Sequence, residues 1–261
     1  MHAAALIRRH ALLALLAAFS ATAQAQNAPS TFEPESGQEG KDVVWVPTPQ
    51  VVVDKMLDMA GVRPDDFVMD LGSGDGRTVI TAAKRGARAL GIEYNPDMVA
   101  LSKRNAQKEG VAGKASFVKA DLFETDFSRA SVITLFLLPD INLRLRPKIL
   151  ALKPGTRIVS NTFDMGDWRP DQTVALTEDV GCNVSWCTAH LWIVPARVAG
   201  IHKFAQGELT LKQHYQMLSG TFHTEGKTLP LAGKVHGGDI SFTAGGRKYS
   251  GRMNGTRLEL R

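Results

Sequence analysis

The chain carries an apolar run, an acid and three alternating glycines in the stretch Val68-Met69-Asp70-Leu71-Gly72-Ser73-Gly74-Asp75-Gly76-Arg77. The apolar run predicts a buried strand, and the apolar spacing of residues 78–83 predicts a helix directly after the glycines. Glycine lets the backbone approach a ligand closely, and a helix N-terminus presents free amides. The stretch therefore predicts a nucleotide-type binding site made of a strand, a glycine loop and a helix.

The class of ligand follows from the spacing and from the acids. Dinucleotide sites carry Gly-x-Gly-x-x-Gly and accept a pyrophosphate, whereas this stretch has Gly-x-Gly-x-Gly with Asp70 before it and Asp75 inside it. Two carboxylates would repel a pyrophosphate, but they suit a ligand that carries an ammonium group. S-adenosylmethionine has an ammonium group and no phosphate. A glycine-rich turn without a ligand is the alternative that this stretch alone leaves open.

Two further acids end the next two predicted strands. Residues 89–93 end at Glu93, whose carboxylate can accept both ribose hydroxyls, and residues 115–120 are followed by Asp121, which can accept from an adenine amino group. Glu93 alone would also fit a dinucleotide enzyme. Because open α/β sheets bind ligands at the carboxyl ends of their strands, the three acids are expected in one crevice.

This three-part pattern resembles the class I S-adenosylmethionine-dependent methyltransferases. Further stretches resemble the small archaeal protein-lysine methyltransferases of broad specificity and the mitochondrial ATP-synthase c-subunit lysine methyltransferases: 46–49, 70–77, 122–126, 135–138, 152–160 and 166–168. The resemblance covers about residues 43–195 and implies a protein-lysine substrate. Motif and resemblance together predict these cofactor-binding residues: Thr48, Asp70, Gly72, Ser73, Gly74, Gly76, Glu93, Tyr94, Asp121 and Leu122.

The order of elements predicts an α/β fold with a Rossmann-like, seven-stranded methyltransferase sheet. Thr48 is expected to cap a first helix, with Pro49 at its first position, and Asn95-Pro96 to begin another in the same way. A fourth strand is expected over 132–138 and a fifth over 157–163, with a helix between them that Pro147 should kink or split. Residues 180–195 are expected to close the sheet as an antiparallel hairpin.

The acceptor side is predicted after the fourth and fifth strands. Asp140, Asn142 and Asn161 are the candidate catalytic residues, and Asn161 stands where we expect a histidine in close relatives. Phe136, Phe163 and Trp168 are candidates for an apolar slot, with plain core as the alternative. The sequence Leu-Pro-Asp-Ile at 138–141 replaces the Asn/Asp-Pro-Pro-aromatic motif of enzymes that methylate nucleic-acid amines, so nucleobase amines are not expected as substrates.

The two ends of the chain differ from the middle in composition and in the pattern of polar and apolar residues. Residues 1–25 have the basic, apolar and small-x-small order of a signal peptide, which predicts export to the periplasm, although the cofactor is supplied in the cytosol. Residues 26–42 are expected to be a disordered leader and 43–198 the methyltransferase domain. Residues 205–261 alternate in polarity and contain a weak repeat, which predicts an appended small antiparallel all-β meander or barrel.

Composition limits the partners. The net charge of +5 is too weak to indicate nucleic acid, and the histidines and cysteines show no metal-ligand spacing. Cys182 and Cys187 are expected either to form a disulfide or to be two small buried side chains. A protein substrate is expected, with no membrane span after signal removal, and the oligomeric state is left open. The alternatives are a small-molecule methyltransferase and an exported S-adenosylmethionine-binding module without turnover.

Overall fold

The computed structural model describes residues 32–261. The predicted signal peptide and the first residues of the leader lie outside the described residues. Residues 34–261 form one unit that contains two β-sheets of seven strands each. No helix among residues 32–261 is both long enough and apolar enough to cross a membrane.

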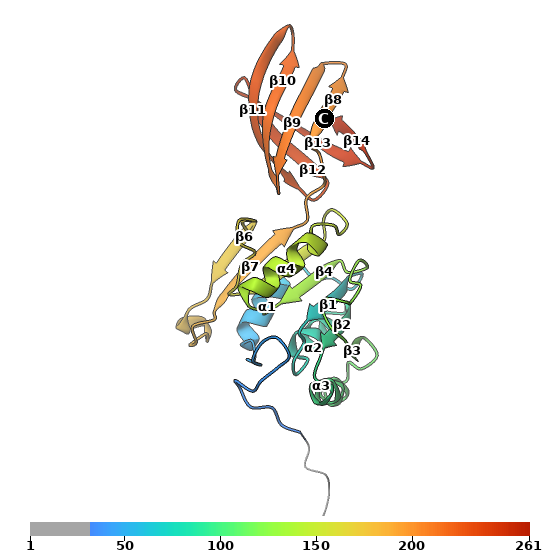
Figure 1. Ribbon diagram of the computed structural model, residues 1–261, viewed down its shortest axis with the longest axis vertical. Helices are drawn as coiled ribbons and strands as arrows, with labels where there is room; N and C mark the ends of the chain where they lie inside the picture. Colours follow the sequence, from blue (N-terminus) through green and yellow to red (C-terminus); the bar gives the residue numbers. More distant parts are fainter. Residues whose placement is uncertain (1–31) are drawn as a thin grey trace, which may run out of the picture. The chain divides into compact units, whose positions relative to one another are not determined.

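The first sheet confirms the predicted Rossmann-like, seven-stranded methyltransferase sheet, and its strand order is β3-β2-β1-β4-β5-β7-β6 (Figure 1). Strands β1 to β5 are parallel, and β7 pairs antiparallel with both β5 and β6. The strands are β1 Phe67–Leu71, β2 Arg88–Glu93, β3 Ala115–Lys119, β4 Val132–Leu135, β5 Arg157–Asn161, β6 Gln172–Ala175 and β7 Thr188–Ile193.

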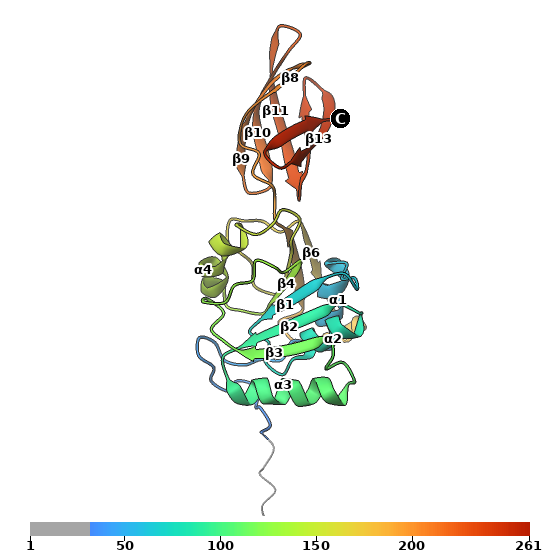
Figure 2. The same ribbon diagram turned by 90° about the vertical axis from the view of Figure 1, so that its right-hand side faces the viewer.

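Helices cover both faces of this sheet, as Figure 2 shows for α4 on one side and α1 on the other. They are α1 Gln50–Met59, α2 Arg77–Lys84, α3 Pro96–Lys108 and α4 Pro139–Ile149. Val68 of β1 belongs to the core that α1, α2 and α3 complete, whereas Met69 and Leu71 belong to the core under α4. Alternate residues of a strand point to opposite faces, so the apolar run of β1 supplies both cores.

Several predicted boundaries were wrong. The fourth strand stops at Leu135, and residues 136–138 lie outside the ladder before α4 begins at Pro139. Pro147 does not split α4, since it falls in the last turn and removes a single hydrogen bond there. Helix α1 begins at Gln50 with Pro49 as its N-cap and no side-chain cap from Thr48. The closing hairpin begins at Gln172, and residues 178–180 form a short 3-10 turn (η1).

The second sheet is an antiparallel meander in chain order, which confirms the predicted all-β part. Its strands are β8 Gly200–Phe204, β9 Gly207–His214, β10 Met217–Thr224, β11 Lys227–His236, β12 Asp239–Ala244, β13 Arg247–Asn254 and β14 Arg257–Leu260. Alternate side chains such as Leu209, Leu211 and Phe222 are buried in its own core. The weak sequence repeat corresponds to β11–β12 and β13–β14, each a strand, a tight turn and a strand.

Candidate active site

The glycine loop joins β1 to α2 with three glycines in the left-handed region, where L-residues are strained. Gly74 has φ +52°, and a Cβ at this position would lie 2.4 Å from Nε1 of Trp45. The loop therefore admits no side chain here, because its backbone already touches an indole ring. Gly76, which we predicted as a cofactor contact, caps α2, and a Cβ there would meet Phe117 and Ser102.

A pocket lies at the carboxyl edge of β1, β2, β3 and β4, where the sequence predicted the ligand. The structure brings nine of the ten predicted cofactor residues to its wall, and Gly76 is the exception: Thr48, Asp70, Gly72, Ser73, Gly74, Glu93, Tyr94, Asp121 and Leu122. Residues 38–48 also line this pocket. The three acids from three successive strands therefore share one cavity.

Asp70 is buried at the bottom of this pocket. Burial raises the pKa of its carboxyl to about 7, and the negative charges of Glu93 and Asp75 add to the effect, while a hydrogen bond from Thr134 Oγ1 at 2.5 Å opposes it. A buried carboxylate in the company of two other acids favours a positively charged ligand group beside it. The site of Asp70 therefore suits the ammonium group of S-adenosylmethionine.

Glu93 is held by backbone donors on both of its oxygens. Gly74 N donates to Oε2 and Asn95 N donates to Oε1, each at 2.9 Å. These bonds fix the carboxylate but leave lone pairs free toward the pocket. Ser73 also lines the pocket, while its Oγ is buried toward Gly91 of β2 without a hydrogen-bond partner among residues 32–261. Three carboxylates around one pocket match the ammonium, ribose and adenine groups of the cofactor, so the residues present fit it.

Asp121 forms an ion pair with a lysine of the segment that precedes α1. Lys41 Nζ lies 2.5 Å from Asp121 Oδ2 and 5.1 Å from the centre of the Tyr94 ring. The Lys41 ammonium holds the pKa of the Asp121 carboxyl below its usual value, and so does the hydrogen bond that the backbone N–H of Phe123 donates to Asp121 Oδ1 at 2.8 Å. The sequence analysis missed Lys41, because no local pattern in the polar leader indicates which distant carboxylate a lysine will reach.

Trp45 is another pocket residue that the sequence analysis missed. Gly37 N donates to Trp45 O at 2.8 Å and Trp45 N donates to Gln38 O at 2.9 Å. These two bonds close residues 37–45 into a loop on the pocket, in a segment that the sequence analysis divided between a disordered leader and the domain start. The only local signal was an aromatic residue within the apolar run 43–46.

The three candidate catalytic residues do not line the pocket. Asp140 is exposed in the first turn of α4, while Asn142 and Asn161 are fully buried. Asn142 Nδ2 donates to Asp164 O at 3.1 Å, and Asn161 Oδ1 accepts from Thr162 Oγ1 at 2.9 Å. Their other amide atoms, Asn142 Oδ1 and Asn161 Nδ2, have no hydrogen-bond partner in the described part of the chain. Asn142 therefore supports the backbone after β5 and Asn161 bonds the Thr162 hydroxyl, and each amide keeps one polar atom without a partner in the described residues.

The aromatic candidates separate into pocket and core. Phe136 lines the pocket and stacks on Phe163, with ring centres 6.0 Å apart. Trp168 is fully buried against Trp192, whose Nε1 donates to Trp168 O at 2.7 Å. Phe136 thus lies on the pocket wall at the predicted acceptor side, with Phe163 stacked on it, and Trp168 belongs to the core.

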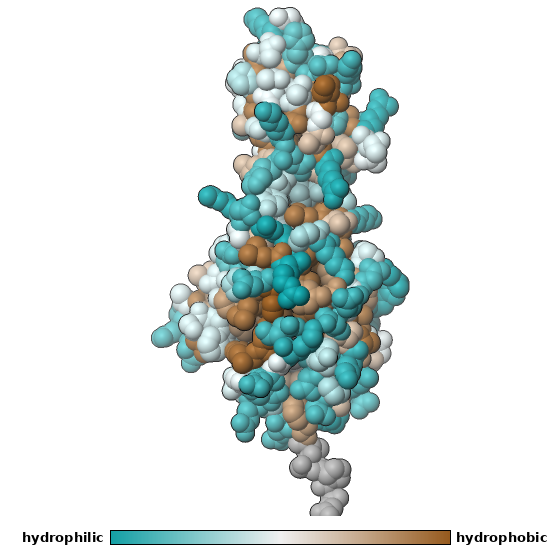
Figure 3. All heavy atoms as spheres, in the orientation of Figure 1, coloured by the Kyte–Doolittle hydropathy of each residue, from teal (hydrophilic) through white to brown (hydrophobic). Residues whose placement is uncertain are grey.

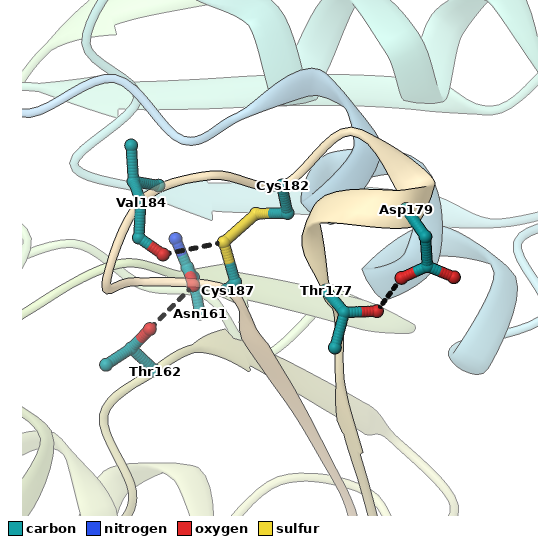
Figure 4. Close-up of a disulfide and its surroundings, with 7 residues drawn as sticks. All are labelled: Asn161, Thr162, Thr177, Asp179, Cys182, Val184 and Cys187. Carbon is teal, nitrogen blue, oxygen red and sulfur yellow. Dashed lines mark hydrogen bonds between the residues drawn. A yellow bond between two sulfur atoms is a disulfide. The ribbon is translucent and has the colours of Figure 1, made fainter.

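Cys182 and Cys187 form a disulfide, which decides between the two alternatives left open by the sequence. The bridge closes the loop between β6 and β7, and Figure 4 shows it beside Asn161 and Thr162. Thr162 has φ +60° and its amide donates to Thr188 O. The disulfide therefore lies next to the strained residue that follows β5.

Comparison with known proteins agrees with this geometry. A family profile described as the ANTKMT methyltransferase domain matches residues 70–172. The protein-lysine N-methyltransferase of Saccharolobus islandicus is 44% identical over 155 residues, a match that spans 58% of this chain and 94% of that protein. The chain belongs to this methyltransferase family.

Two other relatives of this methyltransferase bear on the substrate and the cofactor. The human ATP synthase c-subunit lysine N-methyltransferase is 38% identical over 128 residues, a match that spans 49% of this chain and 54% of that relative. A crystal structure titled as an RNA methyltransferase from Salinibacter ruber, in complex with S-adenosylhomocysteine, is 47% identical with a TM-score of 0.53, and covers 59% of this chain and 96% of that one. The cofactor of this methyltransferase is S-adenosylmethionine.

Proposed function

We propose that this methyltransferase transfers a methyl group from S-adenosylmethionine to the ε-amine of a protein lysine. The observation that carries the proposal is the pocket with Asp70, Glu93 and Asp121 at three successive strand ends, in a chain 44% identical to a protein-lysine methyltransferase. Asp70 would hold the ammonium group, Glu93 the ribose hydroxyls and Asp121 the adenine amino group. S-adenosylmethionine, when bound, supplies an electrophilic methyl group.

The chain's own residues must then deliver a neutral amine. A lysine has a reference pKa of about 10.4, and burial against apolar groups lowers that value. Phe136 and Leu137 present such a surface on the pocket wall. Because desolvation removes the proton, the site needs no strong general base, which agrees with the position of Asp140, Asn142 and Asn161 outside the pocket wall. Orientation of the two reactants can supply roughly 7–11 kcal/mol of the barrier.

The surface around the pocket favours a macromolecular acceptor. Hydrophobic side chains gather around α4 on the face in Figure 3. Leu138 and Leu143 of this region are 46% and 38% exposed, and Val44 and Tyr94, which line the pocket, are 52% and 48% exposed. Contiguous exposed apolar residues mark sites of protein interaction. This surface supports a protein acceptor over a small polar molecule.

RNA is the second candidate acceptor, because the Salinibacter ruber relative is titled an RNA methyltransferase. Residues 138–141 argue against a nucleobase amine, as described above. The test incubates the protein with methyl-labelled S-adenosylmethionine and three fractions of cells that lack the gene: protein, RNA and small molecules. Label in the protein fraction that is released as methyllysine supports the proposal. Label in the RNA or small-molecule fraction would identify RNA or a small molecule as the acceptor and contradict the proposal. No label in any fraction would indicate a binding module without turnover.

We further propose that the protein is exported and loses residues 1–25. The order of Arg8-Arg9, an apolar run and Ala23-Gln24-Ala25 supports export. The disulfide between Cys182 and Cys187 also favours an oxidising compartment. Cell fractionation followed by N-terminal sequencing tests this proposal, and a cytosolic protein that begins at Met1 would refute it. An exported enzyme would need a source of cofactor outside the cytosol.

A further inference from the structure

The turn between β9 and β10 is unusual for a hairpin tip. It consists of two residues, Tyr215 and Gln216, between the paired residues His214 and Met217. Two-residue hairpin turns favour Asn-Gly, because their central residues often require positive φ. Tyr215 has φ +52°, a conformation that a bulky side chain rarely adopts. Gln216 is only 4% exposed. A strained tyrosine and a buried glutamine at a hairpin tip indicate that other contacts hold this turn in place.

Those contacts lie on the loop that follows β5 in the methyltransferase sheet. The Tyr215 ring stacks on Trp168, with centres 5.9 Å apart and an angle of 20°, and its hydroxyl donates to Asp167 Oδ1 at 3.0 Å. Gln216 Nε2 donates to Arg169 O at 2.7 Å. The two residues of the turn therefore hold three consecutive residues of this loop.

The same loop reaches the pocket at its other end. Phe163 stacks on Phe136, which lines the pocket, and Asn142 of α4 donates to Asp164 O. One turn later in α4, Arg146 donates to Met165 O at 2.7 Å and forms an ion pair with Asp167. Residues 163–169 thus lie between the hairpin tip and the acceptor-side wall.

Asp167 joins the two groups of contacts. It accepts from both Arg146 and the Tyr215 hydroxyl, and these bonds hold the pKa of its carboxyl below its usual value. The Arg146 guanidinium also lies 5.5 Å from the centre of the Tyr215 ring. A charge-assisted cluster of this kind fixes geometry more tightly than a single neutral bond. Movement of the hairpin tip is therefore transmitted to both α4 and the loop.

We propose that Tyr215 and Gln216 are positioning residues for methyl transfer, through which the second sheet holds residues 163–169 and the Phe136–Phe163 wall in place for the acceptor. The inference rests on the proposed function in one respect, that the acceptor meets this wall. It gives the second sheet a role on the acceptor side of the reaction and none in cofactor binding, because neither residue lines the pocket.

The test compares the full-length wild type with Tyr215→Ala, Tyr215→Phe and Asp167→Ala. The matched control is Glu225→Ala, since Glu225 is likewise the first residue of a two-residue turn, between β10 and β11, with φ +49°, but is exposed. Tyr215→Phe removes the hydroxyl and keeps the ring, so it remains informative if Tyr215→Ala fails to fold, whereas Asp167→Ala removes the Arg146 ion pair together with the hydroxyl's partner and should speed exchange at least as much as Tyr215→Phe. Hydrogen exchange of residues 162–169 is measured first, because it requires no acceptor.

We expect Tyr215→Ala to speed exchange in residues 162–169 by about tenfold, Tyr215→Phe to speed it less because the stack remains, and Glu225→Ala to leave it unchanged. The half-saturating concentration of the methyl-accepting protein extract should rise about tenfold in Tyr215→Ala, while the calorimetric Kd for S-adenosylmethionine stays within about twofold. Unchanged exchange, unchanged transfer or an equal loss in cofactor affinity would each overturn the inference. If the wild type labels no protein, the proposed function fails, and the exchange data still decide whether the turn at Tyr215 holds residues 163–169 in place.

Discussion

Lys41 Nζ lies 2.5 Å from Asp121 Oδ2, at the end of the pocket assigned to the adenine amino group. The other oxygen of Asp121 already accepts from Phe123 N. Each oxygen keeps a second lone pair, but the Lys41 ammonium already lies against Oδ2 on a carboxylate assigned to the adenine amine, so the two positive or donor groups would crowd the same carboxylate. The segment that contains Lys41 lines the same pocket, so the ion pair ties this segment to the carboxylate at the end of β3.

Replacing Lys41 by Met keeps most of the side-chain volume and removes the competing charge. We expect the Kd for S-adenosylmethionine to fall by roughly threefold, a modest change because exposed ion pairs contribute little. Isothermal calorimetry at two salt concentrations measures it, and the difference between wild type and variant should shrink at high salt. A clearly weaker complex would mean that Lys41 contacts the cofactor instead of competing with it.

The raised pKa of Asp70, about 7, predicts a pH dependence of cofactor binding. The ammonium group needs an ionised carboxylate, so affinity should be constant above pH 7 and fall by up to about tenfold for each pH unit below it. Calorimetry between pH 5.5 and 8.5 tests this slope. Asp70→Asn should bind weakly at every pH, and a wild-type affinity that does not vary with pH would contradict the assignment.

The raised pKa of Asp70 also predicts how the stability of the cofactor-free protein changes with pH. Because its folded pKa lies above its unfolded value, the folded state holds the extra proton between pH 4 and 7. The contribution of Asp70 to the free energy of unfolding should therefore decrease as pH rises through this window. Comparing the denaturation midpoints of wild type and Asp70→Asn isolates the effect, and the difference between them should vary in this window alone.

Glu93→Ala removes the proposed ribose acceptor, the bond from Gly74 N that fixes the glycine loop, and the bond from Asn95 N at the start of α3. We expect cofactor binding to weaken by at least roughly 1.5 kcal/mol, the scale of a lost charged hydrogen bond. Asp97→Ala is a suitable control, since Asp97 is exposed in the first turn of α3 and does not line the pocket. Equal affinity in wild type and Glu93→Ala would refute the ribose assignment.

A chain that ends at Val198 lacks the second sheet but keeps every residue of the pocket wall. Its cofactor affinity should stay within about threefold of the full chain, which corresponds to roughly 0.7 kcal/mol. Its melting temperature and its methyl transfer should fall, because Trp168 loses the Tyr215 ring and Asp171 loses the Lys234 ammonium 2.8 Å away. Loss of cofactor binding by a folded truncated chain would show that the second sheet helps to build the pocket.

The sequence predicted most of the pocket-lining acids and glycines, because parallel strands bring their carboxyl ends to one edge, so that three local patterns implied one pocket. Lys41 and Trp45 could not be predicted, since their place depends on backbone bonds between residues 37 and 45 and on a carboxylate 80 residues away. The acceptor side was harder for the same reason. The hairpin at Tyr215 follows from alternation and length, but its contact with Trp168 is tertiary and leaves no periodic signal.

Mass spectrometry of lysine methylation in cells with and without the gene tests the central claim most directly. Cells that lack the gene should lose methyl groups from specific lysines, wild-type protein should restore them, and Glu93→Ala should restore them poorly at equal protein level. An unchanged lysine methylome, or restoration by Glu93→Ala to the wild-type level, would contradict methyl transfer from this pocket to protein lysine.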